Sequence, residues 1–266
     1  MTAYYNEIEP YAVQWLRNLI TAGHIADGEV DERSIVDVRP ADLAGFTQCH
    51  FFAGIGGWSH ALRLAGWPDN RPIWTGSCPC QPFSVAGKGA GTDDPRHLWP
   101  HFHRLIAAVR PPVVLGEQVA GQAGYGWLDG VRADLERENY ASRGVDIPAC
   151  AVDAPHIRQR LYWIASDMAD ADNAKRWSDG AKGDIDDGRQ AGWHQDTSDA
   201  GACDPSFWSD HIWLTGSDGK ARRVKSGISL LADGVPNRVG KLRAYGNAIA
   251  PPLAAEIIGA YMDVTS

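Results

Sequence analysis

The chain has 266 residues, of which 44% are hydrophobic and 22% charged, so it is long enough to bury the core of one large domain. It contains no run of about 18 apolar residues, and the stretch MTAYYNEIEP lacks the basic and then apolar order of a secretory signal. We therefore expect a cytoplasmic protein without a membrane span. The net charge of -8 argues against the strongly cationic surface of a non-specific nucleic-acid binder.

The spacing of apolar residues predicts helices that alternate with short strands. In chain order we expect a helix over 11–20, a strand over 47–52, a helix from a glycine turn to residue 65, a strand over 72–75, a helix over 98–109, strands over 112–116, 141–147 and 161–165, and a closing helix over 251–262. This order predicts an α/β fold with a mostly parallel sheet and helices on both of its faces.

The composition changes near Ser166. Residues 167–220 are rich in Asp, Gly, Ala and Ser and lack the long apolar runs of a full domain core, so we expect an irregular insert. Cations gather at its end, in a stretch whose only acidic residue is Asp233: Lys220, Arg222, Arg223, Lys225, Arg238, Lys241 and Arg243. A run of this kind is a solvated surface about as often as it is a contact for phosphates.

Phe52–Gly57 (FAGIGG) form a glycine-rich turn between a predicted strand and a predicted helix. At such a turn the backbone can approach a ligand closely, and the helix N-terminus can receive polar or anionic groups. The spacing differs from the full dinucleotide fingerprint, and a turn of this kind is purely structural about half of the time. The turn alone therefore leaves a ligand site and a structural role open.

A second motif, Ser77–Ser84 (SCPCQPFS), places a cysteine at the carboxyl end of a predicted strand, the edge at which open parallel sheets bind ligands. A free thiol has a pKa of about 8.5, so a nucleophilic Cys80 needs a nearby cation, and Arg158 and Arg160 are the candidates. Cys78 and Cys80 could instead bind a metal or act as a redox pair, but the sequence holds no second Cys or His pair at zinc-ligand spacing. We therefore expect a reactive thiol and no metal site. The five cysteines, an odd number, also argue against a disulfide framework.

Glu117 directly follows the apolar strand residues Val113–Leu115, so its carboxyl should lie at the same edge of the sheet as Cys80. A carboxyl in that position is costly unless it is used or paired. A thiol, a carboxyl and two arginines beside a glycine turn fit covalent catalysis with acid assistance.

Five motifs in order carry a family resemblance. FFAGIGG, PCQPFS, Glu117-Gln118-Val119, Arg158-Gln159-Arg160 and GNAIAP (246–251) resemble the cofactor loop, nucleophile loop, acid motif, double-arginine motif and closing motif of the DNA cytosine-5 methyltransferases. The resemblance covers about residues 45–165 and 238–262, and PCQPFS is its most specific part. It implies a Rossmann-like fold, S-adenosyl-L-methionine as cofactor, double-stranded DNA as partner and a monomeric enzyme of DNA methylation, as in restriction-modification. Gln118 and His156 depart from the family pattern, which has Asn and Gln there.

The order of the cofactor segments also departs from the family, in which the glycine loop is followed by a ribose segment, an adenine segment and only then the nucleophile. About twenty residues separate Gly57 from Cys78 here, too few for two further strand and helix units. Asn6–Ala12 resembles the ribose segment, and Arg33–Ile35 resembles the adenine segment. We infer a permutation in which these two strands come first and join the same sheet. The alternative is an unrelated helical extension over residues 1–45, with impaired cofactor binding.

The resemblance implies a role for each site residue. The catalytic group is Cys80, Glu117, Arg158 and Arg160; the cofactor group is Phe52, Ala53, Gly54, Ile55, Gly56, Gly57, Glu7, Ile8, Ser34, Ile35, Pro79, Asn247 and Ile249; the DNA group is Gln81, Ser84, Arg222, Arg223, Arg238 and Arg243. Cys80 would attack C6 of a cytosine flipped out of the duplex, while Glu117 holds or protonates N3. Residues 1–165 and 236–266 would form the catalytic domain, and 166–235 a small target-recognition region.

Other functions fit the same motifs. A relative in the same family methylates a tRNA cytosine with the same thiol and acid, and a catalytically inactive DNA-binding protein could keep the fold. Free nucleotides fit less well as substrates, because the insert has the size of a recognition region. Cofactor binding, and a comparison of duplex DNA with tRNA as methyl acceptors, discriminate between these functions.

Overall fold

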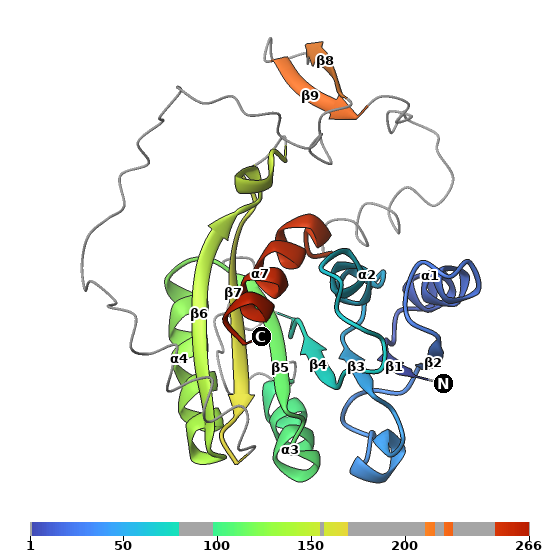
Figure 1. The fold of residues 1–266 in the computed structure, drawn as a ribbon, viewed down its shortest axis with the longest axis vertical. Coiled ribbons are helices and arrows are strands. Elements are labelled where there is room, and N and C mark those ends of the chain that lie inside the picture. Colours follow the sequence, from blue (N-terminus) through green and yellow to red (C-terminus); the bar gives the residue numbers. More distant parts are fainter. Residues whose placement is uncertain are drawn as a thin grey trace.

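The computed structural model describes residues 2–79, 98–154, 157–169, 211–215, 221–225 and 248–265. A seven-stranded sheet in the order β2-β1-β3-β4-β5-β7-β6 forms its centre (Figure 1). The strands are β1 (Ala3–Asn6), β2 (Gly28–Asp31), β3 (Gln48–Phe51), β4 (Ile73–Gly76), β5 (Val113–Val119), β6 (Tyr140–Pro148) and β7 (Gln159–Asp167). Neighbouring strands from β2 to β5 pair in parallel, whereas β7 is antiparallel to both β5 and β6. The predicted mostly parallel sheet is therefore confirmed.

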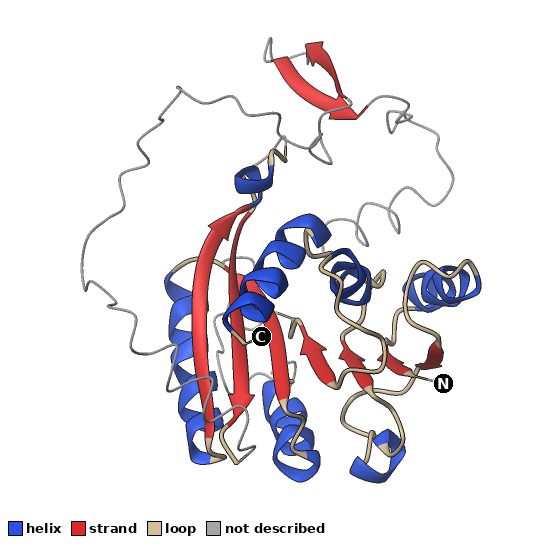
Figure 2. Cartoon of the chain, viewed as in Figure 1, coloured by secondary structure: helices blue, strands red, loops and turns tan. Residues whose placement is uncertain are grey.

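Helices cover both faces of the sheet, as predicted (Figure 2). They are α1 (Pro10–Thr21), α2 (Gly57–Leu64), α3 (Trp99–Val109), α4 (Gln122–Arg137) and α7 (Pro251–Val264), with the 3-10 helices η1 (Pro40–Leu43) and η3 (Ala149–Val152). One core cluster includes buried residues of α3 and α4, and a second includes those of α2 and α7. A third cluster lies between β1 and α1. The sheet is thus the middle layer of three.

The N-terminal segment is part of the main sheet. All four residues of β1 are buried, and β1 pairs with β2 on one side and with β3 on the other. The register places Ala3 opposite Gln48 and Asn6 opposite Phe51. The inferred joining of the N-terminal strands to the main sheet is therefore confirmed, and the alternative of a separate helical extension over residues 1–45 is wrong.

Two features of the sheet region were not predicted. The helix α4 contains Gly124, Gly126 and Gly130, which obscure a helical pattern, although its buried residues Trp127, Leu128, Val131 and Leu135 recur at helical spacing and could have revealed it. The connection between β6 and β7 is short, and its described residues include the single-turn helix η3. A short connection suits an antiparallel pair, because a parallel crossover needs a dozen or so residues, usually a helix.

Within the expected target-recognition region, the structure describes one hairpin. β8 (His211–Thr215) pairs in antiparallel register with β9 (Ala221–Lys225) as a separate two-stranded sheet. Most of the acidic stretch of the insert (167–218) lies outside the described residues, namely 170–210 and 216–218. Among the helices that the structure does describe, none combines the length and apolar character needed to cross a bilayer.

Candidate active site

The candidate site lies where the parallel strands end at their carboxyl edge. The residues that follow β1, β3 and β4 are Glu7, Phe52 and Ser77, and these three strands are neighbours in the sheet. Loops at this edge of an open parallel sheet are the usual ligand-binding position, because the crevices between them face outward. The predicted ribose, glycine-loop and nucleophile segments are therefore brought to one edge.

The glycine turn has a left-handed backbone at three positions. Phe52 has a φ of 54°, Gly54 of 55° and Gly56, which caps α2, of 81°. A side chain on Gly57 would also clash, because its Cβ would lie 2.8 Å from Cγ1 of Ile249. Glycine is thus required here both for conformation and for the close approach of the segment before α7.

A pocket of about 460 Å3 adjoins this turn. Its lining includes Ile55 of the turn, Trp15 of α1, His60 of α2, and Arg158 and Ile249 from later in the chain. Five residues predicted for the site therefore meet around one cavity: Ile55, Gly56, Gly57, Arg158 and Ile249. Its volume lies within the range of small-molecule pockets.

Glu7 joins the end of β1 to the glycine turn. Its Oε2 accepts a hydrogen bond from the backbone N–H of Gly54 at 2.7 Å, and its Oε1 accepts one from the N–H of Glu9 at 2.9 Å. Each carboxylate oxygen has a second lone pair, so Glu7 can still accept hydrogen bonds from hydroxyl groups of a ligand. The next side chain, Ile8, is 62% exposed and offers an apolar surface beside this carboxylate.

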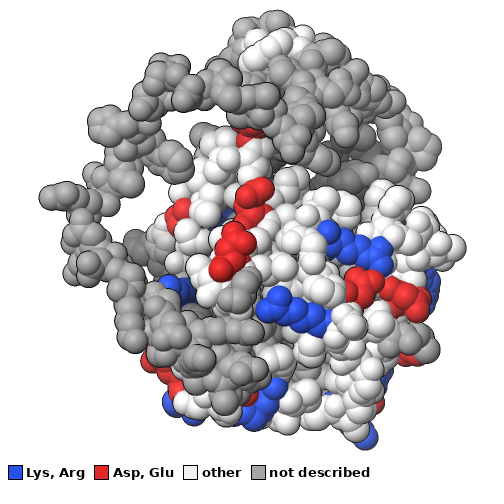
Figure 3. Space-filling view, in the orientation of Figure 1, with Lys and Arg blue, Asp and Glu red and all other residues white. Residues whose placement is uncertain are grey.

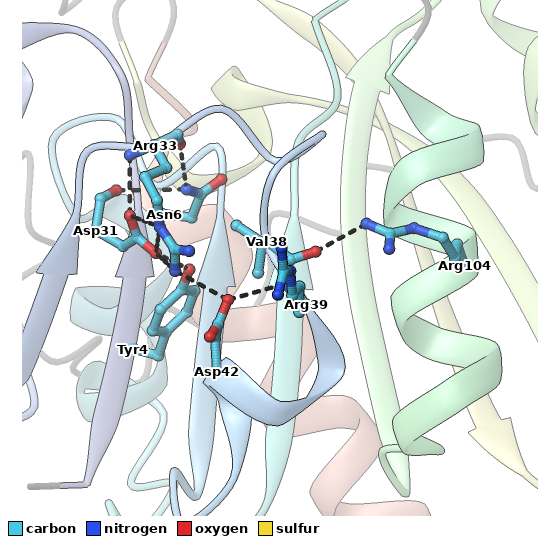
Figure 4. A network of polar contacts seen from close by, with 8 residues as sticks. All are labelled: Tyr4, Asn6, Asp31, Arg33, Val38, Arg39, Asp42 and Arg104. Carbon is cyan, nitrogen blue, oxygen red and sulfur yellow. Dashed lines mark hydrogen bonds and ion pairs between the residues drawn. The ribbon is translucent and has the colours of Figure 1, made fainter.

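A network of polar contacts fixes the chain at the end of β2 (Figure 4). Asn6 is buried, and its Nδ2 donates to the backbone oxygens of Asp31 at 3.3 Å and Arg33 at 2.8 Å. The carboxylate of Asp31 accepts from the Tyr4 hydroxyl at 2.6 Å, and Arg33 bridges Asp31 at 2.6 Å and Asp42 at 3.0 Å. Burial raises the pKa of Asp31, but the hydrogen bonds from Arg33 and Tyr4 outweigh it, so the net pKa is lowered.

This network holds the predicted adenine segment. Ser34 is half-buried, and its Oγ accepts from the N–H of Val36 at 3.3 Å. The Ile35 side chain is only 2% exposed and belongs to the core cluster that also contains Tyr4 and Val38. The structure therefore gives the Ile35 side chain a packing role, and Ser34 is the more accessible of the two.

Glu117 lies inside β5 rather than after its end, since the strand continues to Val119, which corrects the predicted strand boundary. The carboxyl is nearly buried, and its Oε1 lies 2.8 Å from Nε of Arg160. Burial raises the pKa of Glu117, and this effect exceeds the opposing influence of Arg160, Arg158 and the Ser77 hydroxyl. The predicted meeting of this carboxyl with Arg160 is thus observed.

Arg158 lies directly before β7 and contacts the segment that precedes α7. It has a positive φ of 35°, and its Nη2 donates a hydrogen bond to the backbone oxygen of Ala248. Burial is the largest influence on its guanidinium and lowers the pKa of Arg158, while Glu117 acts in the opposite direction. Arg158 therefore connects the carboxyl site with the segment that precedes α7.

The segment before the predicted nucleophile is described as far as Pro79, whereas Cys80, Gln81 and Ser84 lie outside the described residues. Nε2 of Gln118 donates to the backbone oxygen of Cys78 at 3.4 Å, which attaches this segment to β5. Cys78 itself is buried, and burial strongly raises the pKa of its thiol, so it remains protonated and unreactive.

Sequence reasoning missed two polar residues beside this segment. Nε1 of Trp58, the second residue of α2, donates to Oγ of Ser77 at 3.0 Å. Only the position of Trp58 directly after the glycine turn could have indicated this contact. Of the remaining predicted residues, Asn247, Arg238 and Arg243 lie outside the described part of the chain, as do the side chains of Arg222 and Arg223 in β9.

Residues 68–197 match the sequence model of the C-5 cytosine-specific DNA methylases, so the match includes the strands that carry Glu117 and Arg160. These residues, just under half of the chain, belong to a domain of this family. The match implies S-adenosyl-L-methionine as the cofactor. The match begins after the glycine turn and leaves out the rearranged N-terminal strands.

Curated Type II methyltransferases resemble parts of the chain. It is 36% identical over 108 residues to the Type II methyltransferase M.AplI of Arthrospira platensis, covering 40% of this chain and 30% of that protein. It is 24% identical over 170 residues to the Type II methyltransferase M.HhaI of Haemophilus parahaemolyticus, covering 49% of this chain and 52% of that protein. The chain thus spans between about a third and a half of the length of these relatives.

Solved structures of methyltransferases are more distant in sequence. A DNMT2 variant from Spodoptera frugiperda has a TM-score of 0.42 and 18% identity, covering 61% of this chain and 41% of that chain. The methyltransferase EhMeth of Entamoeba histolytica has a TM-score of 0.43 and 16% identity, covering 61% of this chain and 44% of that chain. At values this low, the likeness says nothing about substrate.

Proposed function

We propose that this cytosine methylase transfers the methyl group of S-adenosyl-L-methionine to C5 of a cytosine in duplex DNA, through a covalent bond between Cys80 and C6. The observation that carries the proposal is the ion pair between the nearly buried Glu117 and Arg160, at 2.8 Å, beside the segment that leads to Cys80. A carboxyl with a raised pKa next to a predicted nucleophile is the arrangement that acid-assisted addition to a pyrimidine needs.

The cofactor residues proposed for this site fit the polarity of S-adenosyl-L-methionine. Glu7 would accept hydrogen bonds from the ribose hydroxyls, and the exposed Ile8 would contact the purine, together with Ser34 and the backbone near Ile35. The turn Phe52–Gly57, with Pro79, Asn247 and Ile249, would hold the methionine part. When bound, the cofactor supplies an electrophilic methyl group on a positively charged sulfur.

The catalytic residues proposed here act on the base. The Cys80 thiolate would add to C6 while Glu117 holds or protonates N3, so that electron density moves to C5. Acid assistance of this kind is worth about 10² to 10⁴ in rate. After methyl transfer, a base would remove the C5 proton, the Cys80 sulfur would leave as thiolate, and any proton placed on N3 would return to Glu117, which restores the aromatic ring. Arg160 and Arg158 would contact the base and favour the thiolate as fixed cations.

Methylation of duplex DNA requires that the target cytosine leave the double helix, at a cost of a few kcal/mol. Residues 166–235 are proposed as the target-recognition region, and 1–165 with 236–266 as the catalytic domain. Figure 3 shows Lys and Arg interspersed with Asp and Glu on the face that it presents, so the described residues of that face form no continuous basic strip. We therefore propose Gln81, Ser84, Arg222, Arg223, Arg238 and Arg243 as the DNA contacts.

The test is methyl transfer by the purified full chain, with labelled S-adenosyl-L-methionine and either duplex DNA or tRNA as acceptor. We expect label in the C5 position of DNA cytosines and none with Cys80→Ala. Label in tRNA alone would overturn the DNA assignment. A failure to bind S-adenosyl-L-methionine in calorimetry would instead favour an inactive DNA-binding relative.

A further inference from the structure

The environment of Glu117 contains more than the arginines. Along β5, Val113, Leu115 and Glu117 alternate on one face, and the first two belong to the core cluster that also contains Trp58 of α2. Opposite Glu117 in the register lies Tyr162 of β7, whose ring meets that of Trp58 edge-on at 6.0 Å. The carboxyl therefore lies on the side of the sheet that α2 covers.

Ser77 lies between Trp58 and Glu117. The indole Nε1 of Trp58 donates to Oγ of Ser77 at 3.0 Å. Ser77 and Glu117 directly follow Gly76 and Gly116, which pair in the parallel register of β4 and β5, so the two residues are neighbours across these strands, and the Ser77 hydroxyl lowers the pKa of the Glu117 carboxyl. An indole N–H can only donate, so Oγ of Ser77 must be the acceptor in its bond with Trp58. The hydroxyl proton of Ser77 is then free to be donated to the carboxylate.

We propose that Trp58 and Ser77 are positioning residues for Glu117, which rests on the proposed function of that carboxyl. The indole fixes the serine hydroxyl, and the serine and Arg160 together hold the carboxyl in one orientation toward the base. This chain of contacts starts at the second residue of α2, directly after the glycine turn, and ends at the proposed acid. It therefore connects the cofactor loop with the group that acts on the base.

The charged and titratable groups around Glu117 define the expected pH effect. They are Arg160, Arg158 and Tyr162 from β7 and the segment before it, with Ser77 as a neutral donor. Removal of the Ser77 hydroxyl takes away a donor that lowers the pKa of Glu117, so this pKa rises further. A step that needs protonated Glu117 then remains fast up to a higher pH.

The experiment compares Ser77→Ala, Trp58→Phe and the double variant with wild type. We expect each single variant to lower kcat about ten-fold, the loss of about one hydrogen bond to a charged group, while KM for S-adenosyl-L-methionine stays within about two-fold. In Ser77→Ala, the high-pH limb of the kcat profile should also move to higher pH. Trp58→Phe should add little in the Ser77→Ala background, because it acts through the serine. Ser77→Thr, which keeps the hydroxyl, should restore most of kcat.

Two matched controls separate this role from general packing. Trp67→Phe removes another indole N–H bond, to the backbone oxygen of Arg71 at 3.1 Å, and Ser59→Ala removes a buried hydroxyl of α2 that bonds Tyr5. We expect neither to move the high-pH limb. Equal losses in the controls, additive losses in the double variant or an unmoved limb in Ser77→Ala would each overturn the proposal.

An NMR measurement that needs no catalytic turnover tests the same contacts if one of these variants folds poorly. The ¹⁵N resonance of the Trp58 indole, assigned from Trp58→Phe, should shift with pH in wild type and lose that shift in Glu117→Gln. A resonance that titrates unchanged in Glu117→Gln would contradict the relay. Because this readout uses no substrate, it distinguishes failure of the relay from failure of the proposed methyl transfer.

Discussion

At the residue scale, the proposed site depends on the Glu117 carboxyl. Burial raises its pKa, whereas Arg160, Arg158 and the Ser77 hydroxyl lower it. The sequence predicted the meeting of Glu117 and Arg160 from the expected strand edge, and the structure has them at 2.8 Å. It could not predict Trp58 and Ser77 as partners, because their contact depends on where α2 lies over β4 and β5. The nucleophile Cys80 remains a prediction.

Substitution of Glu117 by Gln tests the acid role. Glutamine keeps the shape but cannot give up a proton, so we expect kcat to fall about 10² to 10⁴-fold. Affinity for S-adenosyl-L-methionine, measured by calorimetry, should change little. An activity within about two-fold of wild type would contradict the role of Glu117 as acid.

The same substitution has a stability signature. Because the folded pKa of Glu117 lies above its ordinary value of 4.5, the neutral form is favoured in the folded state. Its stabilising contribution is full below pH 4.5 and is lost as the pH rises through the folded pKa. We therefore expect the free energy of unfolding of Glu117→Gln, relative to wild type, to increase over that window in urea titrations. A difference that is independent of pH would contradict the raised pKa.

Glu7 and Glu9 form a matched pair for the cofactor site. Both are glutamates near the end of β1, but Glu7 bonds the glycine turn, whereas Glu9 caps α1 through a bond from the N–H of Ala12 at 2.9 Å. We expect Glu7→Ala to weaken S-adenosyl-L-methionine binding by about ten-fold or more, as the loss of a charged hydrogen-bond acceptor. Glu9→Ala should instead cost about 1 kcal/mol of stability with little change in affinity. Equal affinities of the two variants in calorimetry would contradict the assignment of Glu7.

At the scale of elements, the strands and helices with clear apolar periods were predictable, and α1, α3 and α7 lie within a few residues of their predicted bounds. The glycines of α4 concealed a helix whose apolar face is regular. The apolar pattern did not predict β1 and β2, and only the family resemblance pointed to them. Their inferred place in the same sheet is confirmed by the pairing of β1 with both β2 and β3.

The strand β3 carries a buried histidine that makes the fold sensitive to acid. His50 is buried, its Nδ1 lies 2.8 Å from the Thr75 hydroxyl on β4, and burial lowers its pKa from 6.5 to about 3. Below pH 6.5 the unfolded chain takes up a proton on His50 that the folded chain does not. The free energy of unfolding therefore decreases as the pH is lowered, by up to about 1.4 kcal/mol per pH unit.

We expect His50→Gln to remove this part of the acid sensitivity, as measured by urea unfolding at pH 7.5 and 5.5. Thr75→Val is the control, because it loses the same hydrogen bond but keeps the buried imidazole, and should retain the pH dependence. If His50→Gln shows the wild-type loss of stability, His50 is not the group responsible.

At the scale of the molecule, one sheet holds the proposed cofactor segments and the proposed acid. The sheet order β2-β1-β3-β4-β5 places the ends of β1, β3 and β4 beside each other whatever their order in the sequence. Changed connectivity is therefore compatible with an unchanged site, because the site depends on which strand ends are neighbours. The proposed DNA contacts depend on side chains outside the described residues.

The most direct test of the covalent mechanism is mass spectrometry of the chain after incubation with S-adenosyl-L-methionine and duplex DNA that contains 5-fluorocytosine, because fluorine at C5 cannot be removed as a proton. The account predicts an adduct that survives denaturation and maps to Cys80, is absent in Cys80→Ala and persists in Cys78→Ala. Methylation of ordinary DNA without any trapped adduct, or an adduct at Cys78, would contradict it.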